Sequence, residues 1–330
     1  MNNRRKLLVA LGAGFFAAPL ASFAQQQSKV WRIGFVFSRA RKDLVEMGRD
    51  VEFLQGMREV GLIEGKDFVI DWRFADGKME RLPEIMAELV RANIDLIVST
   101  GTQGSFAAKQ ATTTIPIVIT AEANPVGNGF AASLARPGGN MTGLSTSTAD
   151  LVGKHLELLK EVVPRMSRVA VLRNPTNKGH AAMLGYVQTA ARSIGVQVLA
   201  VAAGTPDDIR RGFAIMKRER PDALICLIDA FYAQQRRQLA DLAIKQRLPS
   251  VFAQIEHATA GGLMFYGQDQ SENYRRAATF IDKILKGAKP GDIPFEQPTK
   301  FTMVINMKTA MALGIKIPNS ILMRADKVIE

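Results

Sequence analysis

The stretch Ile94-Asp-Leu-Ile-Val-Ser-Thr-Gly-Thr-Gln-Gly104, continued by Ile115-Pro-Ile-Val-Ile-Thr-Ala-Glu-Ala-Asn-Pro-Val-Gly-Asn-Gly129, decides the fold. It contains two apolar runs of strand length, 96–98 and 115–119, and small polar residues that open a helical pattern follow each run. Two successive strand-loop-helix units predict a parallel sheet. The loops Thr100-Gly101-Thr102 and Glu122-Ala123-Asn124 should therefore lie side by side at the carboxyl edge, where open α/β sheets bind ligands.

The residues after both strands are typical of helix starts. Asn124 is a good N-cap and Pro125 suits the first helical position, so a helix is expected to begin there. Thr100 to Thr102 should leave backbone N–H groups and hydroxyls free at a helix N-terminus, where a carboxylate could bind. Plain capping without a ligand explains the same residues.

The βα alternation continues on both sides of this stretch. With 330 residues, 47% of them hydrophobic and 22% charged, the chain is long enough for two domains. Strands are expected at 30–38, 68–74, 168–172, 196–201, 223–228, 250–252, 261–267 and 301–305, and helices at 43–60, 76–92, 151–163, 178–194, 206–219, 232–247, 270–286 and 307–313. Two similar halves joined by more than one crossing predict a hinged molecule with a small-molecule cleft between its lobes.

Residues 1–24 read as a signal peptide. They contain the basic segment Arg4-Arg5-Lys6, an apolar segment from Leu7 to Leu20 and a small-x-small site at Ser22-Phe23-Ala24. This pattern predicts export to the periplasm by the Sec or the twin-arginine route. The apolar run is shorter than the roughly 20 residues that a membrane span needs, which argues against an uncleaved membrane anchor. No later segment is long and apolar enough to span, so no span is expected after signal removal.

Charge and motifs argue against other function classes. The chain has 43 Lys and Arg against 31 Asp and Glu, and 40 basic residues remain without Arg4, Arg5 and Lys6. These basic residues are scattered, which does not favour a nucleic-acid partner. The segment 127–132 fits the pattern Gly-x-Gly-x-x-Ala, but it does not follow the first strand as a dinucleotide site requires, so no cofactor is expected. The three histidines have no metal-ligand spacing, and no phosphate-binding loop or serine-hydrolase motif occurs.

Several motifs carry a resemblance to a known family. They are the segments 283–290 (Lys-Ile-Leu-Lys-Gly-Ala-Lys-Pro), 296–301 (Glu-Gln-Pro-Thr-Lys-Phe), 304–310, 134–140 and 157–161. Together they resemble the ABC-transporter substrate-binding proteins that include the tryptophan and tyrosine receptors, from about Val30 to Glu330. The resemblance implies a type I periplasmic-binding-protein fold: two doubly wound parallel-sheet α/β lobes joined by three crossings. Lobe 1 would comprise 30–143 plus 268–297, and lobe 2 would comprise 144–267 plus 298–330.

The positions that match cleft loops of that family are the predicted ligand-binding residues. They are Ser38, Thr100, Gly101, Thr102, Gln103, Glu122 and Asn124 in lobe 1, with Asn174, Asp229 and Tyr266 toward lobe 2. Many relatives have Gly-Asp-Pro-Val where this chain has Ala123-Asn124-Pro125-Val126, so a carboxylate of the family is missing here.

An amino acid ligand would need donors for its carboxylate and an acceptor for its ammonium. Thr100 and Thr102 could supply the donors, and Asp229 or Glu122 could supply the acceptor. Asp229 could equally cap the next helix, and Glu122 could be a solvated loop charge. Tyr266 and Phe231 could stack on an aromatic ligand or could simply pack in the lobe.

The resemblance implies an exported solute receptor that delivers a small polar or amino-acid-like molecule to a membrane permease with a separate ATPase. Such a receptor catalyses nothing, needs no cofactor and is expected to be a monomer. Two alternatives remain open: a periplasmic sensor that passes its closed state to a receptor kinase, and an α/β enzyme that uses the same cleft.

Overall fold

The computed structural model describes residues 29–146, 148–297 and 299–330, with the backbone alone at 148–150. Its first sheet has the order β2-β1-β3-β4-β5, and all of its pairs are parallel. The strands are β1 (Trp31–Phe37), β2 (Phe68–Phe74), β3 (Leu96–Ser99), β4 (Ile117–Glu122) and β5 (Met141–Ser145). The connecting helices are α2 (Arg41–Glu46), α3 (Arg49–Glu59), the short η1 (Met79–Arg81), α4 (Leu82–Arg91) and α5 (Gly101–Ala111).

The second sheet has the order β12-β11-β10-β9-β8-β6-β7. Its strands are β6 (Arg168–Arg173), β7 (Gln197–Ala202), β8 (Ala223–Cys226), β9 (Ser250–Phe252), β10 (Met264–Gly267), β11 (Thr302–Asn306) and β12 (Lys327–Ile329). Its helices are α6 (Thr148–Val162), α7 (Gly179–Ser193), α8 (Pro206–Glu219), α9 (Ala230–Gln234), α10 (Arg236–Lys245), α11 (Ile255–Thr259), α13 (Met307–Leu313) and α14 (Asn319–Leu322). The parallel core ends at β10, because β11 pairs with it antiparallel.

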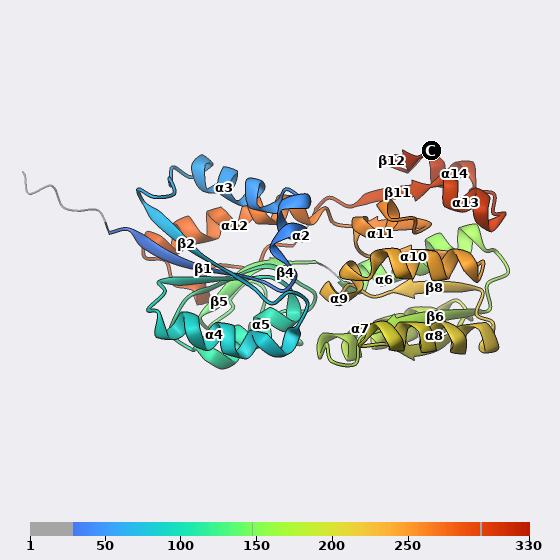
Figure 1. Cartoon of the computed structure of the whole chain (residues 1–330), viewed down its shortest axis with the longest axis horizontal. Coiled ribbons are helices and arrows are strands. Elements are labelled where there is room, and N and C mark those ends of the chain that lie inside the picture. The colour runs from blue at the N-terminus through green and yellow to red at the C-terminus, as the bar shows by residue number, and fades with distance from the viewer. Residues whose placement is uncertain (1–28, 147, 298) are drawn as a thin grey trace, which may run out of the picture.

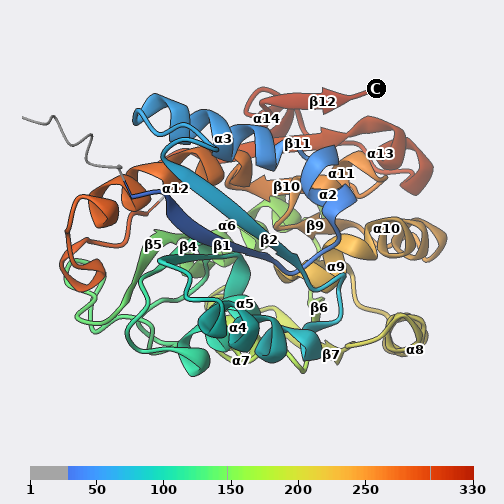
Figure 2. The same cartoon turned by 60° about the vertical axis from the view of Figure 1, so that its left-hand side comes forward.

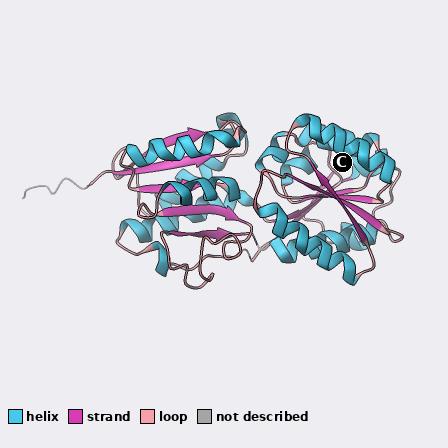
Figure 3. Cartoon of the chain, turned by 90° about the horizontal axis from the view of Figure 1, so that it is seen from below, coloured by secondary structure: helices cyan, strands magenta, loops and turns pink. Residues whose placement is uncertain are grey.

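The two sheets form separate lobes (Figure 1) with helices on both faces of each sheet (Figure 3). Alternate side chains of a strand lie on opposite faces of the sheet. In β1, Ile33 and Phe35 pack in one apolar cluster, and Val36 packs in another. Strands that are apolar on both faces are typical of a parallel sheet covered on both sides. This confirms the fold class predicted from the sequence.

Helix α12 (Gln270–Leu285) returns to the first lobe although it follows β10 of the second. It lies beside α3 in two views (Figures 1 and 2), and its Ile281 belongs to the same apolar cluster as Phe35. After the short helix η2 (Pro290–Asp292), Glu296 forms a parallel bridge with Leu144 of β5. The chain then continues into β11. The described chain thus passes between the lobes near 146, 268 and 299, whereas the residue limits assigned to the lobes stay a prediction.

The expected helix at Asn124 does not form. Residues 124–139 are turns and loops, although Asn124 Oδ1 accepts a hydrogen bond from Gly127 N at 2.9 Å as an N-cap would. Gly129 has φ of 71°, which lies in the left-handed region and stops a helix. The loop is instead anchored by buried Phe130, whose ring centroid lies 4.7 Å from that of Phe106.

Smaller corrections concern other element bounds. The expected helix 232–247 is two helices, α9 and α10, and the expected strand 261–267 begins only at Met264. The signal peptide predicted at 1–24 lies outside the described residues. Within the described part of the chain, no helix combines the length and apolar character needed to cross a bilayer.

Candidate functional site

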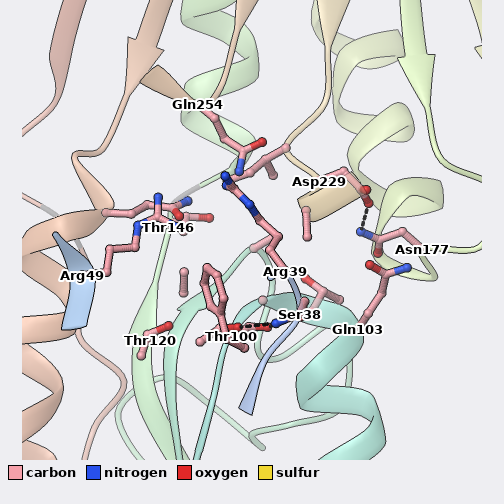
Figure 4. A pocket seen from close by; sticks show the side chains of 18 of the residues that line it. Ser38, Arg39, Arg49, Thr100, Gln103, Thr120, Thr146, Asn177, Asp229 and Gln254 are labelled. Atoms are coloured by element: carbon pink, nitrogen blue, oxygen red, sulfur yellow. Dashed lines mark hydrogen bonds between the residues drawn. The ribbon is translucent and has the colours of Figure 1, made fainter. Parts of the chain in front are cut away.

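A pocket lies between the two lobes, at the carboxyl ends of β1, β3 and β4 and the facing loops of the second lobe (Figure 4). The space inside it that water centres can occupy is about 70 Å³. One water needs about 10–15 Å³ on this measure, so the pocket suits a small solute. Five predicted site residues from the first lobe line it, namely Ser38, Thr100, Gly101, Thr102 and Gln103, and Asp229 lines it from the second lobe.

The wall formed by the first lobe is tied together by its own hydroxyl groups. Thr100 precedes α5, and its Oγ1 donates to Val36 O at 3.2 Å, while Ser38 Oγ donates to Thr100 O at 3.1 Å. Gly101 has φ of 72°, a left-handed conformation that a side chain would strain. These contacts hold the N-terminus of α5 against the end of β1. The loops 100–102 and 122–124, which were predicted to be adjacent, are joined by the hydrogen bond from Thr102 Oγ1 to Glu122 Oε1 at 3.1 Å.

Asp229 is the acidic residue of the opposite wall and is only 3% exposed. Its Oδ1 accepts from Phe231 N at 2.9 Å, which caps α9, and from Asn174 Nδ2 at 3.2 Å. Its Oδ2 accepts from Asn177 Nδ2 at 2.8 Å. Asp229 therefore caps a helix and also lines the pocket, whereas its contact with a ligand stays a prediction.

His180 lies behind Asp229 and is neutral. Burial lowers the pKa of His180, and its Nδ1 accepts a hydrogen bond from Asn174 N at 2.7 Å. A ring nitrogen that accepts carries no proton, so Nε2 carries it and donates to Ile228 O at 3.0 Å. No histidine charge therefore compensates Asp229.

Two arginines of the pocket were not among the predicted site residues. Arg39 and Arg49 line it from the first lobe, and both side chains are buried. Glu256 of the second lobe pairs with both, through Oε1, at 3.4 Å from Arg39 Nη1 and 2.9 Å from Arg49 Nη2. Burial alone would raise the pKa of Glu256, but the charges of Arg49 and Arg39 outweigh it and the pKa is lowered. These ion pairs join the lobes beside the pocket.

Thr120, Thr146, Asn177, Gln254 and Tyr274 are further lining residues that the sequence reading missed. Thr120 Oγ1 and Gln254 Oε1 are buried and have no hydrogen-bond partner among the described residues. Thr120 directly follows the predicted strand 115–119 and lies within β4, and Gln254 lies two residues after the predicted strand 250–252. The position of Gln254 at a carboxyl strand end is the signal that could have found it.

Glu122 does not line the pocket, and it is not a solvated loop charge, which was the other interpretation of this residue from the sequence. Its side chain is 0% exposed, and Oε1 accepts from Thr102 Oγ1 at 3.1 Å, Asn124 N at 3.2 Å and Asn128 Nδ2 at 2.8 Å. Oε2 has no partner within the described chain. Burial raises the pKa of Glu122 to about 7, and these hydrogen bonds only partly oppose the rise.

Three other predicted residues also lie outside the pocket lining. Asn124 Nδ2 of the first lobe donates to Tyr186 Oη of the second lobe at 3.0 Å. Asn174 Nδ2 donates to Asp229 Oδ1 at 3.2 Å. The Tyr266 ring stacks on Phe301 with centroids 5.9 Å apart, and Phe231 packs against Tyr232. Both aromatic rings thus have packing partners in their own lobe.

Two α/β lobes with a pocket between them are the architecture found in type I periplasmic-binding-protein-like solute-binding proteins. The family model described as ABC transporter substrate binding protein matches residues 48–329. The chain belongs to this family, which is one of substrate-binding proteins and not of enzymes.

Known relatives agree with this assignment. The Tyrosine-binding protein of Clostridioides difficile is 25% identical over 264 residues, which are 80% of this chain and 76% of the relative. A conserved domain protein from Vibrio cholerae has a TM-score of 0.84 and 27% identity, covering 91% of this chain and 100% of that chain. An ABC domain from Streptococcus pneumoniae in complex with L-Trp has a TM-score of 0.84 and 25% identity, with the same coverage.

Proposed function

We propose that this protein is the exported receptor of an ABC importer and that it captures a small amino-acid-like solute in the pocket between its lobes. One observation carries the proposal: the pocket is lined by both lobes and presents charges of opposite sign on opposite walls. Arg49 and Asp229 face it from opposite sides, with Arg39 between them (Figure 4). Such a layout matches a molecule with separate carboxylate and ammonium groups.

Other features support the same class of ligand. Thr120 Oγ1 and Gln254 Oε1, which have no hydrogen-bond partner within the described chain, give the pocket further polar groups, and buried polar groups are normally hydrogen-bonded. Two similar proteins are described as binding tyrosine or as complexed with L-Trp. The signal-like residues 1–24 and the family support a receptor that meets its solute outside the cytoplasm and passes it to a permease.

Binding would stabilise the arrangement in which both lobes contact the solute, since a ligand shifts the population toward the state that it binds better. The permease would then recognise this closed state. In this scheme the receptor changes shape but leaves its ligand chemically unchanged.

A thermal-shift panel tests the proposal. Ligand-stripped protein is mixed with L-tyrosine, L-tryptophan, other amino acids, simple carboxylates, purines and sugars. A true ligand at about 100 times its dissociation constant adds roughly 2.7 kcal/mol to the stability, or about 5 °C in Tm. If none of these compounds raises Tm, the receptor function is contradicted.

A further inference from the structure

The basic side of the pocket is formed by two buried arginines that come from adjacent parts of the first lobe. Arg39 lies two residues after β1 and is 3% exposed, and Arg49 is the first residue of α3 and is 5% exposed. A cation in the first turn of a helix is unfavourable to the helix dipole, and burial of a guanidinium costs further free energy. Arg49 is therefore placed against two general preferences, which indicates a specific role.

The two guanidiniums converge on a carboxylate of the protein itself. Glu256 Oε1 accepts from both of them, at 2.9 Å from Arg49 and 3.4 Å from Arg39. Arg39 Nη2 also lies 3.4 Å from Asp43 Oδ1, and the guanidinium of Arg49 lies over the ring of Tyr274 at 5.3 Å. The geometry already shows that this pair can hold a carboxylate oxygen between them.

Each arginine keeps part of its donor set unused. Arg39 Nε and Arg49 Nε are both buried and have no hydrogen-bond partner among the described residues. An Nε–H and a neighbouring Nη–H form one of the edges with which a guanidinium binds a carboxylate through two parallel bonds. A buried charged donor without a partner is costly, so an acceptor that enters the pocket gains binding energy at this place.

Among the described lining residues of the opposite wall, none is basic and Asp229 is acidic. Asp229 is an acceptor, and its neighbours Asn174 and Asn177 already donate to it. An anionic group would be repelled there and attracted to the arginines. The orientation of a ligand with one carboxylate is thereby determined.

We propose that Arg39 and Arg49 form the carboxylate-binding subsite of the pocket, and that they make the receptor selective for solutes with a free carboxylate, such as α-amino acids, over the corresponding amides, in which that group is uncharged. The inference rests on the proposed receptor function and adds to it the chemical group that is recognised and the residues that recognise it.

Isothermal titration with matched pairs tests this subsite. The probes are L-tyrosine and L-tyrosinamide, L-tryptophan and L-tryptophanamide, and L-leucine and L-leucinamide. We expect at least one acid to bind and to bind more than tenfold more tightly than its amide. This comparison uses the wild-type chain and so does not depend on how any variant folds.

Variants then locate the effect. Arg39→Gln and Arg49→Gln should each weaken binding of the acid more than tenfold further than binding of the amide, because the loss of an ion pair with Glu256 affects both ligands alike. Measurable binding of the amide also shows that the variant is folded. Arg49→Lys should lie in between, because lysine keeps the charge but lacks the two-donor edge. Arg41→Gln, a change of the same kind at an exposed residue of α2, should match wild type.

The outcomes distinguish a failure of the subsite from a failure of the receptor function. Three results would overturn the subsite and leave the receptor function standing. They are equal affinity for acid and amide, tightest binding by a panel compound without a carboxylate, and unchanged affinity of both glutamine variants for the acid. Absence of binding by every amino acid, carboxylate, purine and sugar would overturn the receptor function and this inference with it.

Discussion

Asp229 is the residue that connects the second lobe to the ligand most directly. It is the acidic group of the pocket lining; it accepts from two side-chain amides and one backbone N–H, and the neutral His180 lies 3.6 Å from its Oδ2. Its negative charge is therefore available to a cation. An ammonium placed at Asp229 and a carboxylate placed at the arginines would orient an amino acid across the pocket.

The charge of Asp229 can be removed with little change of shape. Asp229→Asn should weaken binding of an amino acid by more than tenfold, about 1.4 kcal/mol, but should hardly affect the same acid without its amino group. Titration of both compounds measures this difference. Asp241→Asn, at an exposed position of α10, is the matched control. A parallel loss for both compounds would assign Asp229 a structural role only.

The buried carboxyl group of Glu122 predicts how the stability of the protein depends on pH. Because burial raises its pKa from the ordinary 4.5 to about 7, the folded state holds the proton more tightly than the unfolded state. The stability that this provides is fully present below about pH 4.5 and is lost as the pH rises through about 7. The loss can amount to about 3 kcal/mol.

The variant Glu122→Gln keeps the side chain neutral at every pH. Urea unfolding should show that the free energy of unfolding of this variant does not fall with rising pH as that of wild type does. The difference in free energy of unfolding between the two proteins should therefore grow between pH 4.5 and 8. Glu84→Gln, at an exposed residue of α4, should follow the wild-type profile. If Glu122→Gln also follows it, the carboxyl is charged and solvated at neutral pH.

Single residues of the site were predictable only where they directly follow a predicted strand. Ser38 and Thr100 follow β1 and β3 directly, so the topology alone brings them to the pocket. Arg39 and Arg49 carry no such signal, since charged residues in loops and helix starts are usually solvated. The i,i+4 pair of Arg39 with Asp43 and the position next to Ser38 were the available hints.

At the level of elements, α12 is the segment whose place depends most on tertiary packing. Its backbone approaches α3 so closely that a Cβ at Gly56 would lie 2.2 Å from Arg275 O. Only glycine fits there without a shift of one helix. The contact attaches the return segment of the chain to the first lobe.

Gly56→Ala should therefore destabilise the protein by roughly 1–3 kcal/mol, since overpacking of a close helix contact is costly. Chemical denaturation measures the change. Gly153→Ala in α6 is the control, because a Cβ there meets nothing within 4 Å and alanine favours a helix. Equal stability of the Gly56 variant and wild type would show that α12 is not held in this close contact.

Strands were predicted well because buried parallel strands are short apolar runs that local turns delimit. The turn region 124–139 was not, because Asn124 and Pro125 give the same local signal in a helix start and in an isolated turn. Gly127 and Gly129 decided the outcome by their poor helix propensity. The antiparallel pairing of β11 with β10 follows from the crossing of the chain, which the strand pattern itself does not encode.

At the scale of the whole molecule, buried ion pairs connect the lobes next to the pocket. Glu256 of α11 pairs with Arg39 and Arg49, and Arg236 of α10 lies 3.7 Å from Asp43 of α2. These bonds exist only when the lobes are close. They should therefore contribute to the balance between open and closed forms.

Glu256→Gln should shift the ligand-free protein toward the open form, because it leaves two buried guanidiniums without their shared carboxylate. Small-angle X-ray scattering should detect a larger radius of gyration. Glu46→Gln, which removes a carboxylate that is 62% exposed and 3.7 Å from Arg236, should have a much smaller effect. Identical scattering of all three proteins would mean that the ion pairs do not control closure.

The account as a whole is decided by where a solute sits when it is bound. A crystal structure of the protein with the compound that stabilises it most in the panel measures this directly. The account predicts that the compound touches side chains of both sheets at once, with its acidic end toward Arg39 and Arg49 and its other end toward Asp229. A compound found on one lobe alone, away from these three residues, would contradict it.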